Sequence, residues 1–141
     1  MTAKEYLKEI RTQEFRLRSL EEAIVVLEAK AQKVTQSWSD MPMQQGASDG
    51  IAGIIVKMVD TKRQYIADWD KLIDDRRAAE EILKLMENTT HAGLLWLYYI
   101  RCKDWTVVAE EMGFAERHIY RMHGNALQEF QTLMDDVSKC Q

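Results

Sequence analysis

Two arginines one helical turn apart, Arg117 and Arg121, are the side chains of this sequence with the most specific chemistry. A guanidinium group can donate two parallel hydrogen bonds to a guanine edge, or it can grip a backbone phosphate. Glu116 can accept from the amino group of a cytosine, and Tyr120 can contact a phosphate or a thymine methyl. With His118 beside them, these residue types predict a surface that contacts double-stranded DNA.

The elements that must position these side chains are two short helices joined by a tight turn, expected at residues 105–112 and 116–130. A small residue, a glycine and an aliphatic residue stand at Ala109, Gly113 and Ile119. The small side chain lets the helices approach, glycine allows a left-handed backbone, and the aliphatic side chain fixes the second helix. This spacing predicts a helix-turn-helix. The side chains expected to face inward are Val108, Met112, Ile119, Met122, Ala126 and Phe130. His123 is expected beside the outward-facing side chains of the second helix.

The local charge limits what this pair of helices is expected to do alone. Over residues 100–125 the formal charge is zero, because four basic side chains oppose four acidic ones. Since phosphate contacts supply most non-specific affinity, the predicted binding is weak and salt-sensitive. Arg101 and Lys103, in the turn before the first helix, are further candidates for a phosphate contact. A second copy, or attachment to a larger DNA-bound assembly, would restore affinity through effective concentration.

The segment before these helices predicts the rest of a small C-terminal domain over residues 88–141. Asn88 and the two threonines that follow it are good capping residues for a helix start. The apolar run of residues 94–100 is too continuous for a surface helix and is expected to be buried on most sides. We therefore expect a helix here that closes the core of the helix-turn-helix.

Residues 1–87 are expected to form two long amphipathic helices, separated by a loop at about residues 36–50. The large apolar side chains of this loop, Trp38, Met41 and Met43, are expected to pack back on the helices. Over residues 3–35 the seventh-residue repeat has two sets offset by three, and Gln13 is the one polar member of the ten positions. Residues 51–86 resume the repeat. One of their sets runs Ile51, Met58, Tyr65, Leu72, Ala79, Met86, and the other is assigned to Ile55, Lys62, Trp69, Arg76 and Leu83. Such a pattern fits a helical hairpin within one chain or a coiled coil between copies, and both remain open.

The composition of the 141 residues favours an all-α fold: 46% are hydrophobic, 30% are charged, and there are only one proline and six glycines. No apolar run approaches ~18 residues, so no membrane span is expected, and the N-terminus lacks an apolar signal core. The protein is predicted to be cytoplasmic. The net charge of −4 means that any contact with DNA must come from a local surface. Cys102 and Cys140 fit neither a disulfide framework nor a zinc pattern and are expected to be reduced.

The C-terminal part resembles region 4 of the bacterial sigma-70 family, the module that recognises the upstream promoter element. The resemblance covers roughly residues 90–131 and is carried by Leu97-Tyr98-Tyr99, by Trp105, Val108, Ala109, Met112, Gly113 and Phe114, by Ile119-Tyr120-Arg121, and by Ala126 and Phe130. The full layout resembles small phage regulators of late genes, of the ArpU and RinA type. These resemblances imply a bacterial host cell, promoter DNA and contact with RNA polymerase. The recognition helix is less basic here than in many sigma region 4 modules.

Three functions follow from these patterns. The first is a DNA-binding transcription regulator whose N-terminal helices dimerise or contact RNA polymerase. The second is a DNA-packaging oligomer of the small-terminase kind, and the third is a coiled-coil interaction protein without DNA binding. A homodimer or higher homo-oligomer is expected. An enzyme is not, because His91, His118 and His123 lack metal-ligand spacing and no nucleophile motif or phosphate-binding glycine loop occurs. No cofactor or metal is expected.

Overall fold

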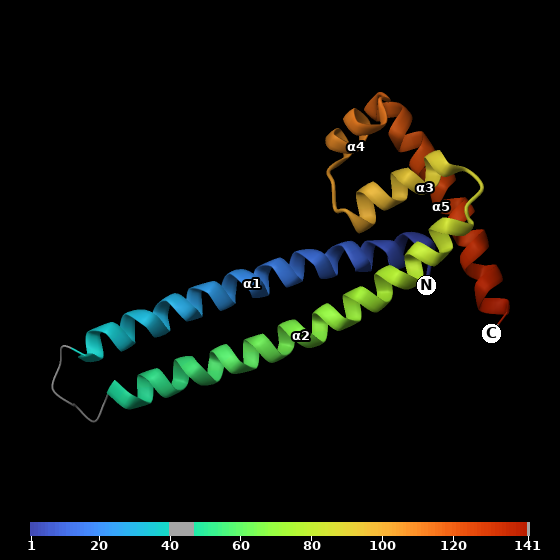
Figure 1. Cartoon of the computed structure of the whole chain (residues 1–141). Coiled ribbons are helices and arrows are strands. Elements are labelled where there is room, and N and C mark those ends of the chain that lie inside the picture. Colours follow the sequence, from blue (N-terminus) through green and yellow to red (C-terminus); the bar gives the residue numbers. More distant parts are fainter. Residues whose placement is uncertain (40–46, 141) are drawn as a thin grey trace. The chain divides into compact units, whose positions relative to one another are not determined.

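The computed structural model describes the backbone of residues 1–39 and 47–140 and the side chains of residues 1–34 and 50–140. Within these residues every regular element is a helix and no strand occurs, so the all-α prediction is confirmed. The elements, in chain order, are α1 (Ala3–Ser39), α2 (Ala47–Leu85), α3 (Thr89–Leu95), the π-helical turn η1 (Trp96–Ile100), α4 (Trp105–Met112) and α5 (Glu116–Lys139) (Figure 1).

The chain divides into two compact units, and the first is built from segments distant in sequence. Met1–Glu14 and Leu72–Gln141 form the first unit, and Phe15–Lys71 forms the second. The sequence pattern alone predicts domains of residues 1–87 and 88–141. The observed division differs because the beginning of α1 and the end of α2 complete the core around α3, α4 and α5.

Contacts between α1 and α5 show why the N-terminus belongs to the first unit. The backbone amide of Ala3 donates a hydrogen bond of 2.6 Å to Oε1 of Gln131. The ring of Tyr6 stacks on that of Phe130, with centroids 6.2 Å apart. Apolar side chains from α1, α2, α3, α4 and α5 are buried in this unit, and the largest that are fully buried are Leu7, Ile10, Leu72, Leu94, Leu95, Val108, Ile119 and Phe130.

The short helices of the first unit begin and end where the sequence predicts. Asn88 caps α3, because its Oδ1 accepts from the backbone amides of Thr90 and His91 at 3.1 and 3.2 Å. Gly113 ends α4 with a left-handed backbone (φ 74°), and its amide and the next one return to carbonyl groups of that helix. Such an ending satisfies carbonyl groups that a helix C-terminus otherwise leaves without partners.

Replacing Gly113 by alanine should lower the free energy of unfolding by about 1–2 kcal/mol, because a Cβ disfavours the left-handed backbone. No atom lies within 4 Å of a Cβ built there, so the loss comes from the backbone alone. Gly124→Ala is a control of opposite sign. Gly124 is exposed inside α5, where alanine is favoured by about 0.5–1 kcal/mol. Urea denaturation gives the free energy of unfolding of both variants. If Gly124→Ala lowered it as much as Gly113→Ala does, the left-handed backbone at Gly113 would not be the cause of the loss.

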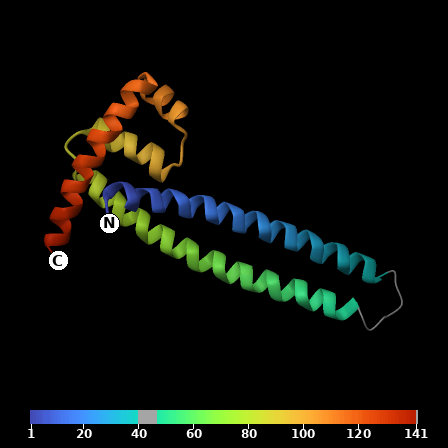
Figure 2. The ribbon, with the colours of Figure 1, turned by 180° about the vertical axis from the view of Figure 1, so that it is seen from behind.

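In the second unit α1 and α2 lie side by side and run in opposite directions, as Figure 1 and Figure 2 show. On α1 the predicted heptad positions are buried or half-buried here, as expected. On α2 the set that begins at Ile51 is confirmed. An ion pair of 3.2 Å joins Lys62 Nζ on α2 to Glu28 Oε1 on α1. In this unit the two helices therefore face each other along a narrow apolar seam.

The second heptad set predicted for α2 is wrong in this unit. Ile55, Lys62 and Trp69 are exposed, and the positions one residue earlier, occupied by Ile54, Thr61 and Asp68, are half-buried instead. Either set combines with the first one into alternating spacings of three and four residues, so the periodicity allows both. In the structure the set that follows the first by three residues faces α1. The exposed set was the more apolar of the two, which is why the pattern favoured it.

The connection between the long helices is shorter than predicted. Helix α1 continues to Ser39 and α2 begins at Ala47, inside the loop expected at residues 36–50. Residues 35–39 are mostly weak helix formers, but adding a residue to an existing helix needs no new nucleus, so α1 can extend past the end of the heptad pattern. The expectation that Trp38, Met41 and Met43 pack back onto the helices falls outside the described side chains.

Candidate functional site

The exposed beginning of α5 brings together five of the seven predicted DNA-contacting residues. Ile119, Met122, Ala126 and Phe130 are buried, as predicted, and they fix which face of α5 is turned away from the core. The side chains left exposed on the first two turns are Glu116, Arg117, His118, Tyr120 and Arg121. Residues three and four apart on a helix are surface neighbours, so Arg117, Tyr120 and Arg121 share one face.

Aromatic contacts hold two of these side chains against neighbouring elements. The ring of Tyr120 meets the ring of Trp105, at the start of α4, edge to face with centroids 5.6 Å apart. The ring of His118 lies 5.0 Å from that of Phe114, in the turn. Arg117 and Arg121 form no ion pair with a described residue. Their guanidinium groups are therefore available to an external acceptor.

The two basic residues before α4 are placed differently from each other. The guanidinium of Arg101 lies over the ring of Trp96, 5.4 Å from its centroid, and the side chain is exposed. Lys103 is half-buried, and its backbone amide donates to the carbonyl of Leu97 at 3.0 Å. Neither contact joins these side chains to α5. The structure thus groups five predicted residues on α5, with Arg101 and Lys103 on a separate connection.

Arg11 is a positioning residue that the sequence pattern does not reveal. From α1 its Nη1 donates to the carbonyl groups of Tyr98 and Lys103, at 2.5 and 3.1 Å. Its guanidinium also lies over the ring of Tyr98, 4.1 Å from the centroid, and 3.7 Å from Oδ1 of Asp104. The Tyr98 ring in turn stacks on Trp105, with centroids 3.7 Å apart and the planes nearly parallel. Arg11 therefore supports the beginning of α4.

A π-helical turn makes this aromatic cluster possible. The apolar run is helical as predicted, but its second half, η1, is a wider turn closed by the amide of Arg101 on the carbonyl of Trp96 at 2.9 Å. Single π-helical turns inside helices often occur at functional sites. Here the consecutive rings of Tyr98 and Tyr99 meet edge to face, 4.8 Å apart.

His123 faces this cluster and not the exposed side of α5 where the sequence pattern places it. Its Nε2 is 2.7 Å from the hydroxyl of Tyr99, and its ring lies 4.7 Å from Trp105. Burial, helped by the charge of Lys4, lowers the pKa of His123 to about 4. Burial also raises the pKa of Tyr99 to about 12. The pair is therefore neutral at pH 7, and a hydrogen bond joins the tyrosine hydroxyl to Nε2 of a neutral imidazole.

The lowered pKa of His123 predicts a loss of stability in mild acid. An unfolded histidine binds a proton near pH 6.5, whereas the folded one resists it down to about pH 4. Stability from this site is thus present above pH 6.5 and is lost as the pH falls toward 4, by about 1–2 kcal/mol after allowance for solvent screening. His123→Gln should remove this part of the pH dependence of the unfolding free energy. His118→Gln, on the exposed face, should retain it. An unchanged acid slope in His123→Gln would contradict the assignment.

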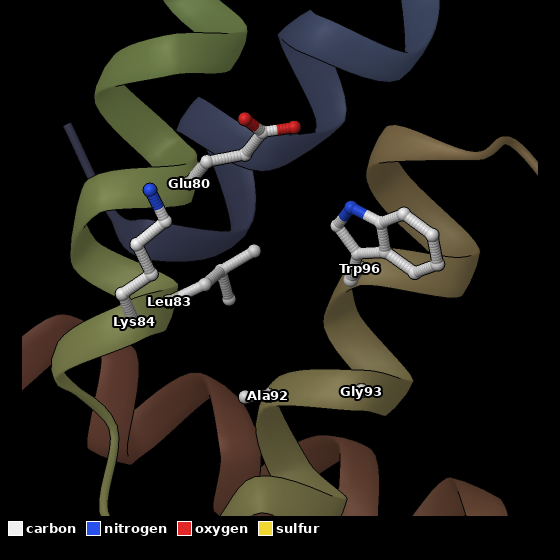
Figure 3. Close-up of a pocket in the computed structure, with 6 residues that line it drawn as sticks. All are labelled: Glu80, Leu83, Lys84, Ala92, Gly93 and Trp96. Atoms are coloured by element: carbon white, nitrogen blue, oxygen red, sulfur yellow. The ribbon is translucent and has the colours of Figure 1, made fainter.

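Two apolar grooves flank Trp96 within the first unit. The first, of about 420 Å³, is lined by Glu80, Leu83 and Lys84 of α2 and by Ala92, Gly93 and Trp96 (Figure 3). Leu83 points from α2 toward the Trp96 side of this groove (Figure 3). The second, of about 490 Å³, is lined by Thr89, Thr90, Gly93, Trp96, Leu97, Met112 and Phe114. Neither groove includes a residue from the exposed face of α5.

Further properties bear on the class of protein. In the part of the chain that the structure describes, no three histidine, cysteine, aspartate or glutamate side chains are placed to hold a metal ion. No described helix has the length and apolar character needed to cross a bilayer. Cys102 and Cys140 are both free thiols. Comparisons with protein-family models, curated proteins and solved structures found no match.

Proposed function

We propose that this protein binds double-stranded DNA and regulates transcription, and that the exposed beginning of α5 enters the major groove. The observation that carries this proposal is the division of α5 into two faces. Ile119 and Met122 are buried, while Arg117, Tyr120 and Arg121 are exposed on the first turns. A helix presented by its N-terminal turns fits the width of the major groove and reaches base edges there.

The order of α4, Gly113 and α5 along the chain supports the proposal, because a helix-turn-helix joins two short helices by such a turn. In the proposed complex α4 crosses the DNA backbone and α5 lies in the groove. Tyr120 is oriented by its contact with Trp105, whereas Arg117 and Arg121 are left to donate to guanine or phosphate. All three side chains are already exposed, so the proposed contact with DNA needs no rearrangement of the core.

The neutral net charge of the candidate interface is the reason why the proposal includes a second copy or RNA polymerase as a partner. The segment over residues 100–125 is formally neutral, so counterion release from phosphate contacts gives it little affinity on its own. The resemblance to sigma region 4 and to small phage regulators supports promoter recognition and a contact with RNA polymerase. The N-terminal helical hairpin is the part of the chain available to supply that contact or a second copy.

Selection of bound duplexes from a random DNA pool by the purified chain tests this function. At about 50 mM salt we expect enrichment of a short motif, and affinity that falls steeply as salt is raised. For a dimer the motif should occur twice, with half-sites one helical turn or a multiple of about 10 base pairs apart. No enrichment at low salt, with the protein folded by circular dichroism, would overturn the proposal.

A further inference from the structure

A second apolar stripe runs along α2 in the second unit, on a face that α1 does not cover. Its large members are exposed: Ile55 and Val59 by 45% each, Ile66 by 59% and Trp69 by 39%. Single exposed apolar residues are normal on a protein surface, but a contiguous row at helical spacing marks an interaction site. The seam toward α1 uses other positions of the same helix, so α2 has two apolar faces here, and no described residue of the second unit covers the second one.

Lys62 falls in the middle of the second stripe without interrupting it. Its Nζ is 3.2 Å from Glu28 Oε1 on α1, so the charge is drawn toward that helix. The methylene stem of a lysine held in this way can cover apolar surface. With Ala52, which is also exposed, the second stripe is Ala52, Ile55, Val59, Lys62, Ile66 and Trp69.

The spacing of the second stripe matches a second copy of itself. Its members are separated by three, four, three, four and three residues, an order that is the same from either end. Alternating steps of three and four residues form the repeat with which one helix packs along another in a coiled coil. A stripe that is the same in both directions is self-complementary about a two-fold axis, as a symmetric dimer requires.

We propose that the second stripe of α2 binds the same stripe of a second copy of this chain, with the two α2 helices antiparallel. In this arrangement the small Ala52 lies opposite the partner's Trp69, and Ile55 lies opposite the partner's Ile66. Val59 lies against the stem of the partner's Lys62. A parallel, in-register pair would instead place the two Lys62 side chains together, and like charges at one level disfavour it. Charge and side-chain size therefore both select the antiparallel dimer.

This dimer supplies the second copy that the proposed function calls for, but it is tested without DNA. In analytical ultracentrifugation the full chain should sediment at twice its 16.5 kDa mass at micromolar concentration. Ile66→Lys should raise the dissociation constant on the order of 100-fold, because it places a charge against the partner's Ile55 inside the interface. Val25→Lys is the matched control. Val25 is 60% exposed on α1, outside the stripe, and its replacement should leave the dimer unchanged.

Crosslinking tests the antiparallel geometry. In a Cys102→Ser, Cys140→Ser background, chains carrying Ile55→Cys and chains carrying Ile66→Cys are mixed and treated with a short bis-maleimide. We expect crosslinks mainly between the two kinds of chain, because these positions face each other. Crosslinks mainly between two Ile55→Cys chains would overturn the antiparallel arrangement. A wild-type chain that stays at 16.5 kDa at about 100 μM, or an assembly that Ile66→Lys leaves intact, would overturn the interface.

Discussion

Alanine at Arg117 or at Arg121 should weaken binding to the selected DNA site by about 1–3 kcal/mol each, which is roughly 5- to 150-fold in the dissociation constant. Both guanidinium groups project from the exposed face of α5, and neither is held by an ion pair with a described residue. In the free protein little is therefore lost by their removal, so the effect should appear in binding and not in folding. A mobility-shift titration at fixed salt measures it.

The same titrations can separate base contacts from phosphate contacts. An arginine that grips a guanine edge should, when removed, relax the sequence preference at one position of the site. One that grips a phosphate should weaken binding to all sequences alike and reduce the slope of log affinity against log salt by about one. Arg117 lies closer to the start of α5, where base edges are reached, so we expect it to show the first behaviour more clearly.

Lys139→Ala is the control for a simple loss of positive charge. Lys139 lies in the last turn of α5, far along the helix from Arg117 and Arg121. Its removal changes the net charge by the same amount and should leave the affinity within about twofold. If Arg117→Ala and Arg121→Ala both bind as the wild type does while Lys139→Ala binds less, the contact surface assigned to α5 is wrong.

Local sequence patterns were sufficient for the elements around the candidate site. Gly113 predicts the left-handed turn and Asn88 predicts the cap of α3, because each acts on backbone groups within a few residues of itself. The inward residues of α5 follow from the helical period alone, as Ile119 and Phe130 illustrate. Helix starts, helix ends and the buried face of a helix can therefore be predicted from the sequence around them.

Contacts between distant segments were not predictable in the same way. Arg11 lies 87 residues from Tyr98, and nothing in the heptad pattern of α1 separates it from the other basic residues of that helix. His123 follows the period of the exposed face closely enough to be placed there, but in the structure it contacts the hydroxyl of Tyr99 and the ring of Trp105. Polar side chains whose partners are far away in sequence carry no periodic signal.

The seam of α2 illustrates a second limit of prediction from sequence. Ile55 and Trp69 are more apolar than Thr61 and Asp68, yet the latter pair is the less exposed one. Hydrophobicity indicates that a face is covered by something, but not whether the cover is α1 or another chain. Of the two apolar stripes on α2, the one with fewer polar members is the better candidate for a contact with a second copy. The positions wrongly predicted to face α1, Ile55, Lys62 and Trp69, therefore belong to the proposed dimer surface.

Arg11→Met should lower the free energy of unfolding of the first unit by about 2–4 kcal/mol, because methionine keeps an apolar stem but donates no hydrogen bonds. The carbonyl groups of Tyr98 and Lys103 would lose a charged donor, at 2.5 and 3.1 Å. The Tyr98 ring would also lose the cation above it. Hydrogen exchange of the amides of α4 is the most local measurement, and their protection should fall more than that of the second unit.

Two controls show which of the contacts of Arg11 matters. Arg16→Met removes an exposed arginine from the same helix and should change stability by less than about 0.5 kcal/mol. Asp104→Asn removes only the carboxylate 3.7 Å from Arg11, on an exposed side chain, where an ion pair contributes little. If Asp104→Asn destabilised the protein as much as Arg11→Met, the ion pair and not the carbonyl contacts would hold the beginning of α4. With the carbonyl contacts dominant, Arg11 acts on the candidate interface by fixing Tyr98 under Trp105, the ring against which Tyr120 rests.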